Sequence, residues 1–152
     1  MNIQILQLIE GAKKARGLTV VIDVFRAFSL EAYLFSLGAE TVIPVGDKEL
    51  AYRMKAENPS YILAGERHGK ILPDFDTGNA PSRLADLNIA GKTVIHTTSA
   101  GTQGIANAIY ADEILGASLV NAKATAEYRS EENNILSNYF LVAMHRETKY
   151  CK

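Results

Sequence analysis

The feature that most constrains the fold is a series of short apolar runs that alternate with helix-length segments. The run "LTVVIDV" is almost entirely apolar and β-branched until Asp23, which is typical of a strand buried on both faces. The segment 26–38 has the length of a helix and ends at Gly38, a residue suited to close one. The alternation predicts an α/β protein with a mostly parallel sheet and helices on both faces, a three-layer sandwich. Strands are expected at 3–9, 18–24, 41–45, 61–65, 93–97 and 113–118, and further helices at 48–58 and 101–110.

Composition narrows the class of protein and of partner. The chain has 152 residues and a formal net charge of −1, whereas a nucleic-acid or anionic-membrane partner usually requires a basic excess. Cys151 is the single cysteine, so neither a disulfide framework nor a cysteine zinc site can be built. No run approaches the roughly 18 apolar residues of a membrane span, and the N-terminus lacks the pattern of a signal peptide. We therefore expect a cytoplasmic protein.

A first polar cluster follows the buried run. In parallel sheets, ligands bind beyond the carboxyl ends of the strands, and Asp23 stands at such an end with Arg26 close behind it. A buried carboxylate is costly unless a metal or a cation offsets its charge. Arg26 could pair with it or hold an oxyanion of a substrate. The alternative is that Asp23 accepts hydrogen bonds from the following backbone amides, as a helix cap.

Two more clusters follow the strand expected at 61–65. In "GERHG", Glu66 could bind a metal or a hydroxyl and Arg67 could clamp an anion; a surface turn is the alternative. In "PDFDTGNAPSR", Asp76 and Asn79 present oxygen ligands of the kind that magnesium takes. A structural loop is the alternative there, since Pro, Asp, Gly and Asn also make ordinary turns.

The fourth cluster is "HTTSAGTQG". The hydroxyls of Thr97, Thr98 and Ser99 stand where a strand should pass into a helix, and Gly101 and Thr102 follow at once. Hydroxyls and free backbone amides at a helix start can bind an anion such as phosphate. A Ser or Thr is also the common way to begin any helix, so a simple cap is the alternative. The extra hydroxyls and the glycine favour an anion site.

Two other patterns carry no site. The three histidines, His68, His96 and His145, show no metal-ligand spacing. The "GKT" at 91–93 resembles the end of a P-loop, but position 86 is Asp where that motif needs glycine.

Six short motifs occur in one order along the chain: "VVIDVFRA", "IPVG", "AGER", "FDTGNAPS", "TTSAGT" and "GASLVNA". In this combination the chain resembles the 2-phosphosulfolactate phosphatase family over roughly residues 1–128. The resemblance implies an α/β fold, Mg²⁺ as the cofactor and the activity of an acid phosphatase. The reaction it implies is hydrolysis of 2-phosphosulfolactate to sulfolactate and phosphate, a step of coenzyme M biosynthesis.

The resemblance also implies roles for the residues in these motifs. Asp23, Glu66 and Asp76 would hold Mg²⁺, and Arg26 and Arg67 would clamp the phosphate or other acidic groups of the substrate. The expected catalytic residues are thus Asp23, Arg26, Glu66 and Arg67. Direct attack by water and a phosphoenzyme formed on Asp23 both stay open. The expected substrate-binding residues are Asn79, Thr97, Thr98, Ser99, Gly101 and Thr102.

The chain departs from the family pattern in two places. Position 100 is Ala where many relatives have Asn, and the resemblance fades after residue 128. We expect a phosphatase-like domain at 1–128 and a divergent tail at 129–152, in which "YFLVAM" could form one last strand and "HRETKYCK" a solvated terminus. The alternatives are a truncated relative that binds anions without turnover and a phosphatase for another small acidic phosphate ester. Self-association into a homo-oligomer stays open.

Overall fold

The computed structural model describes residues 2–131 and 138–144. The strands are β1 (Asn2–Gln7), β2 (Gly17–Ile22), β3 (Thr41–Pro44), β4 (Ile62–Arg67), β5 (Lys70–Ile71), β6 (Thr93–Thr97), β7 (Ala111–Ala117) and β8 (Asn138–Ala143). The helices are α1 (Leu8–Ala12), α2 (Ala27–Ser36), α3 (Lys48–Glu57), the 3₁₀ helix η1 (Pro81–Arg83), α4 (Gly101–Asn107) and α5 (Ala122–Glu131). The predicted alternation of strands and helices is confirmed.

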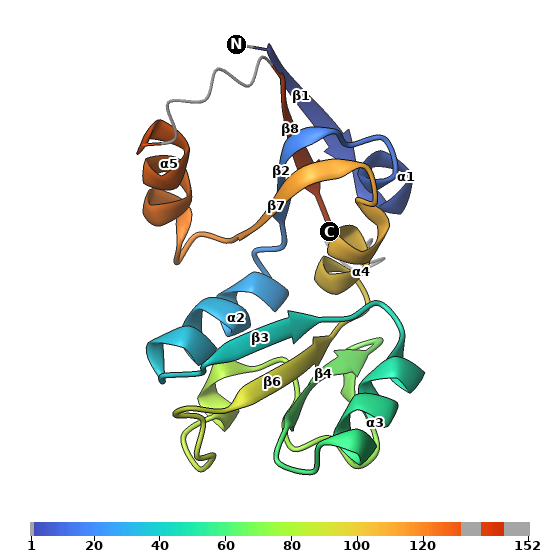
Figure 1. Cartoon of the computed structure of the whole chain (residues 1–152), viewed down its shortest axis with the longest axis vertical. Helices are drawn as coiled ribbons and strands as arrows, with labels where there is room; N and C mark the ends of the chain where they lie inside the picture. Colours follow the sequence, from blue (N-terminus) through green and yellow to red (C-terminus); the bar gives the residue numbers. More distant parts are fainter. Residues whose placement is uncertain (1, 132–137, 145–152) are drawn as a thin grey trace, which may run out of the picture.

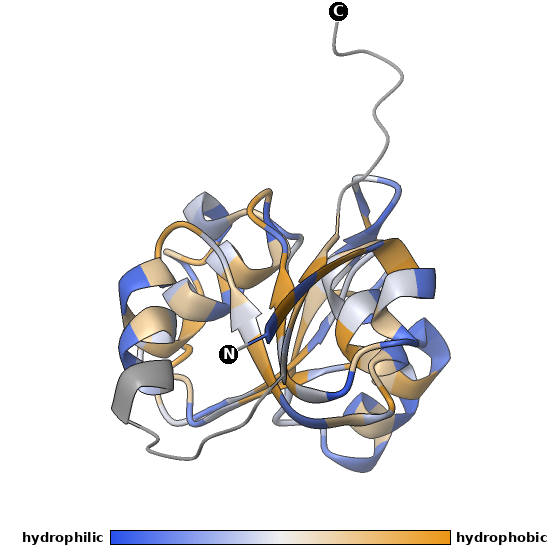
Figure 2. Ribbon diagram, turned by 90° about the horizontal axis from the view of Figure 1, so that it is seen from above, coloured by the Kyte–Doolittle hydropathy of each residue, from blue (hydrophilic) through white to orange (hydrophobic). Residues whose placement is uncertain are grey.

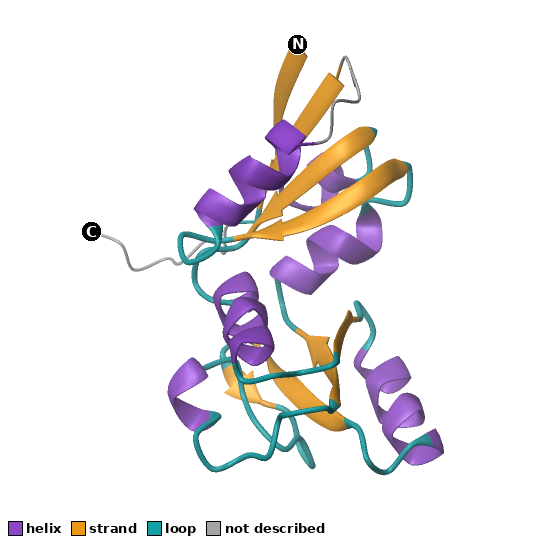
Figure 3. Ribbon diagram, turned by 60° about the vertical axis from the view of Figure 1, so that its left-hand side comes forward, coloured by secondary structure: helices purple, strands orange, loops and turns teal. Residues whose placement is uncertain are grey.

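The strands form two sheets rather than the single sheet that the pattern suggested. Sheet A has the order β1-β8-β2-β7 and is entirely parallel. Sheet B has the order β3-β6-β4-β5, in which β5 alone runs antiparallel. Figures 1 and 3 show the two sheets one above the other, with helices on either side. The α/β class with mostly parallel strands is confirmed.

The chain crosses between the sheets twice within the described residues. It leaves sheet A after β2, builds sheet B through α2, β3, α3, β4, β5, η1 and β6, and returns after β6 through α4 to β7. Figure 1 shows both crossings meeting in the middle of the molecule. The first and fourth polar clusters are these two crossing segments, so the topology brings them together.

Sheet B is the centre of a three-layer arrangement. Alternate residues of a strand point to opposite faces, and here Ala64 and Val94 pack in the cluster that contains Leu34 of α2. Leu63 and Ile95, the intervening residues, pack on the other face with Ala51 of α3. Figure 2 shows hydrophobic strands in the interior and hydrophilic segments mainly on the outer helices.

Sheet A is completed by a strand from late in the chain. The strand foreseen in "YFLVAM" is β8, which pairs with both β1 and β2 in the middle of the sheet. Phe140 and Val142 of β8 are buried together with Val21 and with Ala12 of α1. The boundary at residue 128 stays a prediction, and the terminus expected at 145–152 lies outside the described residues.

Helix ends follow the local chemistry that the sequence indicates. The side chain of Asp47 accepts a hydrogen bond from the amide of Glu49 at 3.0 Å and so caps α3. Gly38 follows α2 with φ +85°, a conformation that glycine adopts at little cost. None of the helices in the described part of the chain is long and apolar enough to span a membrane.

Gly65 lets the ends of β4 and β6 approach each other. It pairs with Thr97 and has φ +148°. A Cβ at this position would lie 2.0 Å from the carbonyl oxygen of Thr97, a backbone atom that cannot move without disturbing β6. The glycine therefore fixes the distance between the Glu66 turn and the segment after β6.

We predict that Gly65→Ala lowers the free energy of unfolding by roughly 2–4 kcal/mol, since it adds a backbone clash to left-handed strain. Gly91→Ala is the matched control, because Gly91 also has a positive φ but has open space around its Cβ position. It should cost about 1 kcal/mol from strain alone. Urea unfolding of both variants measures the difference, and equal losses would contradict the close approach.

Candidate functional site

Two adjoining cavities lie where the chain crosses between the sheets. The smaller, of about 80 Å³, is lined by Asp23 and Ser99 among others. The larger, of about 230 Å³, includes Arg83. They share four lining residues, Arg26, Glu66, Gly69 and Asn79. We call the two cavities together the site pocket.

Asp23 lies between the first turns of two helices. Its carboxylate is 5% exposed, and its Oδ1 accepts a hydrogen bond from the amide of Ala27 at 3.4 Å. On the other side, a Cβ at Gly101 would lie 2.9 Å from Oδ2 of Asp23 and 2.5 Å from Cβ of Ala27. Gly101 is therefore a close-approach glycine, as predicted, but the group that it approaches is the protein's own carboxylate.

Burial dominates the electrostatics of Asp23. It raises the pKa of this carboxyl above its usual value, and the nearby charge of Glu66 acts in the same direction. The amides of Ala27 and Gly101 and the side chain of His96 oppose the shift. The ionised form of Asp23 is thus held at a cost in free energy.

Glu66 joins its own turn to the segment after β6. Its Oε1 accepts a hydrogen bond from the amide of Ser99 at 2.7 Å, and Oε2 accepts from Oγ of Ser99 at 3.1 Å and from the amide of Gly69 at 2.5 Å. The amide of His68 donates to Oγ of Ser99 at 2.8 Å. Glu66 is 8% exposed and lines both cavities. Glu66 and Ser99, predicted as site residues from different clusters, are brought together.

Arg67 lines neither cavity of the site pocket, and its expected role as an anion clamp stays a prediction. Its guanidinium donates to the carbonyl of Glu66 at 2.9 Å, to the carbonyl of Gly46 at 2.8 Å and to Oγ1 of Thr97 at 2.7 Å. Burial lowers the pKa of Arg67 from its usual value, while Glu66 and Asp47 act in the opposite direction. Arg67 ties the ends of β3, β4 and β6 together, because its donors point to backbone and hydroxyl oxygens.

Asp76 does not join Asp23 and Glu66, so the three-carboxylate metal set is not assembled. Its Oδ2 accepts a hydrogen bond from the amide of Leu63 at 2.7 Å and lies 3.3 Å from Nζ of Lys55. These contacts hold it on the side of β4 that faces α3. Asp76 fastens its loop to sheet B.

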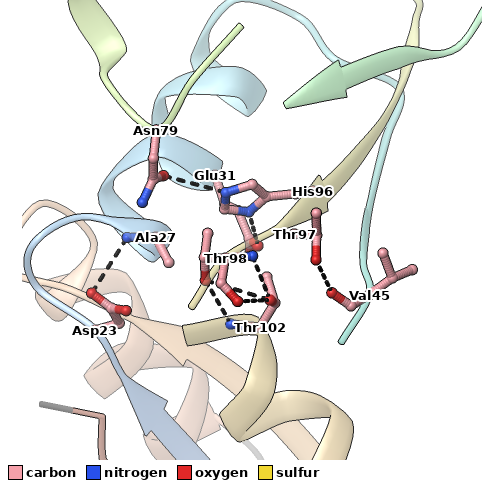
Figure 4. A network of polar contacts seen from close by, with 9 residues as sticks. All are labelled: Asp23, Ala27, Glu31, Val45, Asn79, His96, Thr97, Thr98 and Thr102. Atoms are coloured by element: carbon pink, nitrogen blue, oxygen red, sulfur yellow. Dashed lines mark hydrogen bonds and ion pairs between the residues drawn. The ribbon is translucent and has the colours of Figure 1, made fainter. Parts of the chain in front are cut away.

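The threonine hydroxyls of the fourth cluster form hydrogen bonds inside the protein. Oγ1 of Thr97 donates to the carbonyl of Val45 at 2.7 Å. Thr98 and Thr102 bond reciprocally, each hydroxyl oxygen accepting from the other's backbone amide at 3.1 Å and 2.8 Å. All three residues are buried, and Figure 4 shows their hydroxyls directed at these internal partners. Of the four hydroxyl residues expected to bind an anion, Ser99 lines the pocket and the three threonines line neither of its cavities. Their role in binding a substrate stays a prediction.

Three residues of the site region were missed in the sequence. Arg83 lines the larger cavity, and its signal was its position at the end of "PDFDTGNAPSR". Glu31 and His96 lie together beneath Asn79: Nδ1 of His96 is 2.7 Å from Oε1 of Glu31, and Nε2 is 3.3 Å from Oδ1 of Asn79 (Figure 4). The signal for His96 was a lone polar side chain in an apolar strand, the same signal that pointed to Asp23.

The donor set of the pocket fits a hard divalent cation. Asp23 and Glu66 are two carboxylates on one cavity whose charges repel. Mg²⁺ is commonly held by one or two carboxylates, with waters and substrate phosphates completing its shell. No group of three or more His, Cys, Asp or Glu side chains suited to a metal occurs among residues 2–131 and 138–144. Asp23 and Glu66 are thus the carboxylates of the described residues that line the pocket.

Fold and site together define an α/β protein whose pocket combines two buried carboxylates, Asp23 and Glu66, with two arginines, Arg26 and Arg83. The family model described as 2-phosphosulpholactate phosphatase matches residues 3–151. The chain belongs to this family.

Similar proteins in several bacteria support the assignment. The chain is 37% identical to a probable 2-phosphosulfolactate phosphatase of Carboxydothermus hydrogenoformans, over 84% of this chain and 53% of that protein. It is 42% identical to one of Caldicellulosiruptor saccharolyticus, over 74% of this chain and 47% of that protein. It is 34% identical to one of Bacillus subtilis, over 73% of this chain and 49% of that protein. The chain spans about half the length of these curated relatives.

We predict that Asp23→Asn raises the free energy of unfolding at neutral pH. Because burial raises the pKa of Asp23 in the folded protein, folding disfavours its ionised form. The penalty is absent below the unfolded pKa of about 3.8 and develops as the pH rises through the folded pKa, whereas Asn carries no such penalty. Urea unfolding over a pH series should therefore show an advantage of the variant that grows with pH and then levels off.

Asp86→Asn is the control for this experiment, since it removes one negative charge at an exposed position. It should not reproduce the pH-dependent gain. A variant at position 23 that is less stable than the wild type at neutral pH would contradict the assignment of a buried, unfavourable charge.

Proposed function

We propose that the protein is a cytoplasmic, magnesium-dependent phosphatase that hydrolyses 2-phosphosulfolactate to sulfolactate and phosphate. The observation that carries the proposal is the meeting of Asp23, Arg26, Glu66 and Asn79 on one pocket at the strand ends. Membership of the family supports the reaction, and the names of the relatives support the substrate. The expected partner is thus a small acidic phosphate ester.

The side chains have complementary tasks in such a reaction. Phosphoryl transfer depends mainly on positioning and on neutralising the charge of the phosphoryl oxygens. Arg26 and Arg83 suit this task, because no carboxylate within the described residues lies at ion-pair distance from either. Guanidinium groups bind phosphate oxygens in a two-pronged geometry. Arg26 borders both cavities and would bind the phosphate, while Arg83 would bind a second acidic group of the ester.

The carboxylates supply the metal site. Asp23 and Glu66 would hold Mg²⁺, and Gly69, Ser99 and the helix starts keep both carboxylates in place. A cation bound there neutralises charge on the phosphoryl group and acidifies the attacking water. The pKa of Asp23, raised by burial and by Glu66, would fall if Asp23 held a cation, because an opposite charge favours the ionised carboxyl.

A second candidate function is anion binding without turnover. The observation that favours it is that the two oxygens of Glu66 already accept three hydrogen bonds from Ser99 and Gly69, which compete with a metal for the same oxygens. Such a protein would be stabilised against heat by inorganic phosphate with Mg²⁺ yet release no phosphate from esters.

The test is phosphate release from 2-phosphosulfolactate and from an aryl phosphate, each with Mg²⁺ and with a chelator. We predict activity that requires Mg²⁺ and prefers the acidic ester. Asp23→Asn should lower kcat/KM by about two orders of magnitude or more, since it removes one of two metal-binding carboxylates.

Asp86→Asn, at an exposed position that lines neither cavity of the site pocket, serves as the matched control and should keep wild-type kinetics. Full activity in Asp23→Asn would overturn the metal assignment. Thermal stabilisation by phosphate without release from any ester would favour the second candidate.

A further inference from the structure

A chain of three polar side chains, with the buried His96 in the middle, connects the interior of sheet B with the site pocket. His96 in β6 is fully buried, and Glu31 in α2 is 14% exposed. The distances are 2.7 Å from Nδ1 of His96 to Oε1 of Glu31 and 3.3 Å from Nε2 to Oδ1 of Asn79. Asn79 is the member that lines both cavities, and neither Glu31 nor His96 lines them. Among the hydrogen-bond contacts of the pair, the one that leads to the pocket is the contact with Asn79.

This contact gives the Asn79 amide a direction. Its carbonyl oxygen faces Nε2 of His96, so Nε2 donates and the NH₂ group is turned away from the ring (Figure 4). An NH₂ group donates to phosphate oxygens but does not ligate a metal. The orientation therefore separates two roles that the residue type alone leaves open.

The surroundings show that packing alone does not require such a pair. Leu30, Leu34 and Val94 form an apolar cluster beside it, and apolar side chains of similar volume stabilise such positions as well as a buried polar pair does. A buried polar group costs free energy unless its partners are placed well. The remaining task of Glu31 and His96 is to place Asn79.

We infer that Glu31 and His96 are positioning residues that hold the Asn79 amide with its NH₂ group toward the phosphate of a ligand. The inference rests on the proposed function, because it names which atom of the site meets the phosphate. Glu31 fixes the ring of His96, the ring fixes the carbonyl oxygen of Asn79, and the NH₂ group is left to donate into the pocket.

A double-mutant cycle tests this chain of contacts. Binding of inorganic phosphate with Mg²⁺ is measured by titration calorimetry for the wild type, Glu31→Leu, Asn79→Ala and the double variant. Leu is close to Glu in volume and suits the cluster with Leu30 and Leu34, so the helix should fold. Each single variant should weaken binding about tenfold, as expected for one lost hydrogen bond to a charged group. The double variant should also lose about tenfold, and losses that multiply would overturn the inference.

The direction of the amide is tested by Asn79→Asp. This variant keeps an oxygen toward His96 but replaces the NH₂ group with a second oxygen. It should bind phosphate at least as poorly as Asn79→Ala, whereas wild-type binding would overturn the inference. With the aryl phosphate, Glu31→Leu should raise KM about tenfold, and this effect should vanish in the Asn79→Ala background.

A stability control separates positioning from simple destabilisation. Val94→Ala removes two methyl groups from the same strand and the same apolar cluster, without touching Asn79. It should lower the unfolding midpoint and leave phosphate affinity unchanged. Weakened phosphate binding in Val94→Ala, to the extent seen in Glu31→Leu, would overturn the inference.

Failure of the proposed function has a different signature. A wild type that binds phosphate and hydrolyses no ester overturns the phosphatase proposal, while the cycle still decides the positioning role. A wild type that is an active phosphatase with multiplying losses overturns the positioning role alone. A wild type that binds no phosphate overturns both.

Discussion

The carboxylate of Asp23 is the interaction on which the rest of the site depends. It lies at the end of β2, accepts from the first turn of α2 and is approached by the first residue of α4. The N-termini of helices favour negative charge, and in this protein the carboxylate of Asp23 supplies that charge. Asp23 therefore does two things together: it fixes the two crossings between the sheets and presents a carboxylate to the pocket. The raised pKa of Asp23 reflects the free energy that it costs to keep this buried carboxylate ionised.

The close approaches around Asp23 follow from glycines rather than from polar groups. Because Gly101 has no side chain, the side chains of Asp23 and Ala27 can lie against it. In the same way, the carbonyl of Thr97 can lie against Gly65. Neither position leaves room for a side chain, so side-chain contacts at Gly101 bring the two crossing segments together and a backbone contact at Gly65 brings the ends of β4 and β6 together. Glu66 can reach the amide of Ser99 only because β4 and β6 end so near each other.

The sequence predicted the strands and the location of the pocket well. It predicted poorly which way individual side chains point. Apolar runs identified six of the strands, and the rule that ligands bind at carboxyl ends brought Asp23, Arg26, Glu66, Asn79 and Ser99 to one pocket. Residue type could not tell that Arg67 and Asp76 would bond inward to Gly46 and Leu63. Arginine and aspartate satisfy backbone groups as readily as ligands, and the choice depends on tertiary distances that the sequence does not contain. His96 was set aside because spacing along the chain says nothing of Glu31, which is 65 residues away.

The placement of β8 has a consequence for the order in which the protein can fold. β1 and β2 are neighbours in sequence, but β8 lies between them in the sheet. Sheet B can assemble from a continuous stretch of chain, whereas sheet A must wait until residues 138–143 are present. Contacts between distant segments slow folding, because loop closure costs entropy before the contacts form. β1 thus lacks its pairing partner, β8, during the early part of folding. We expect sheet A, which carries Asp23, to be completed after sheet B.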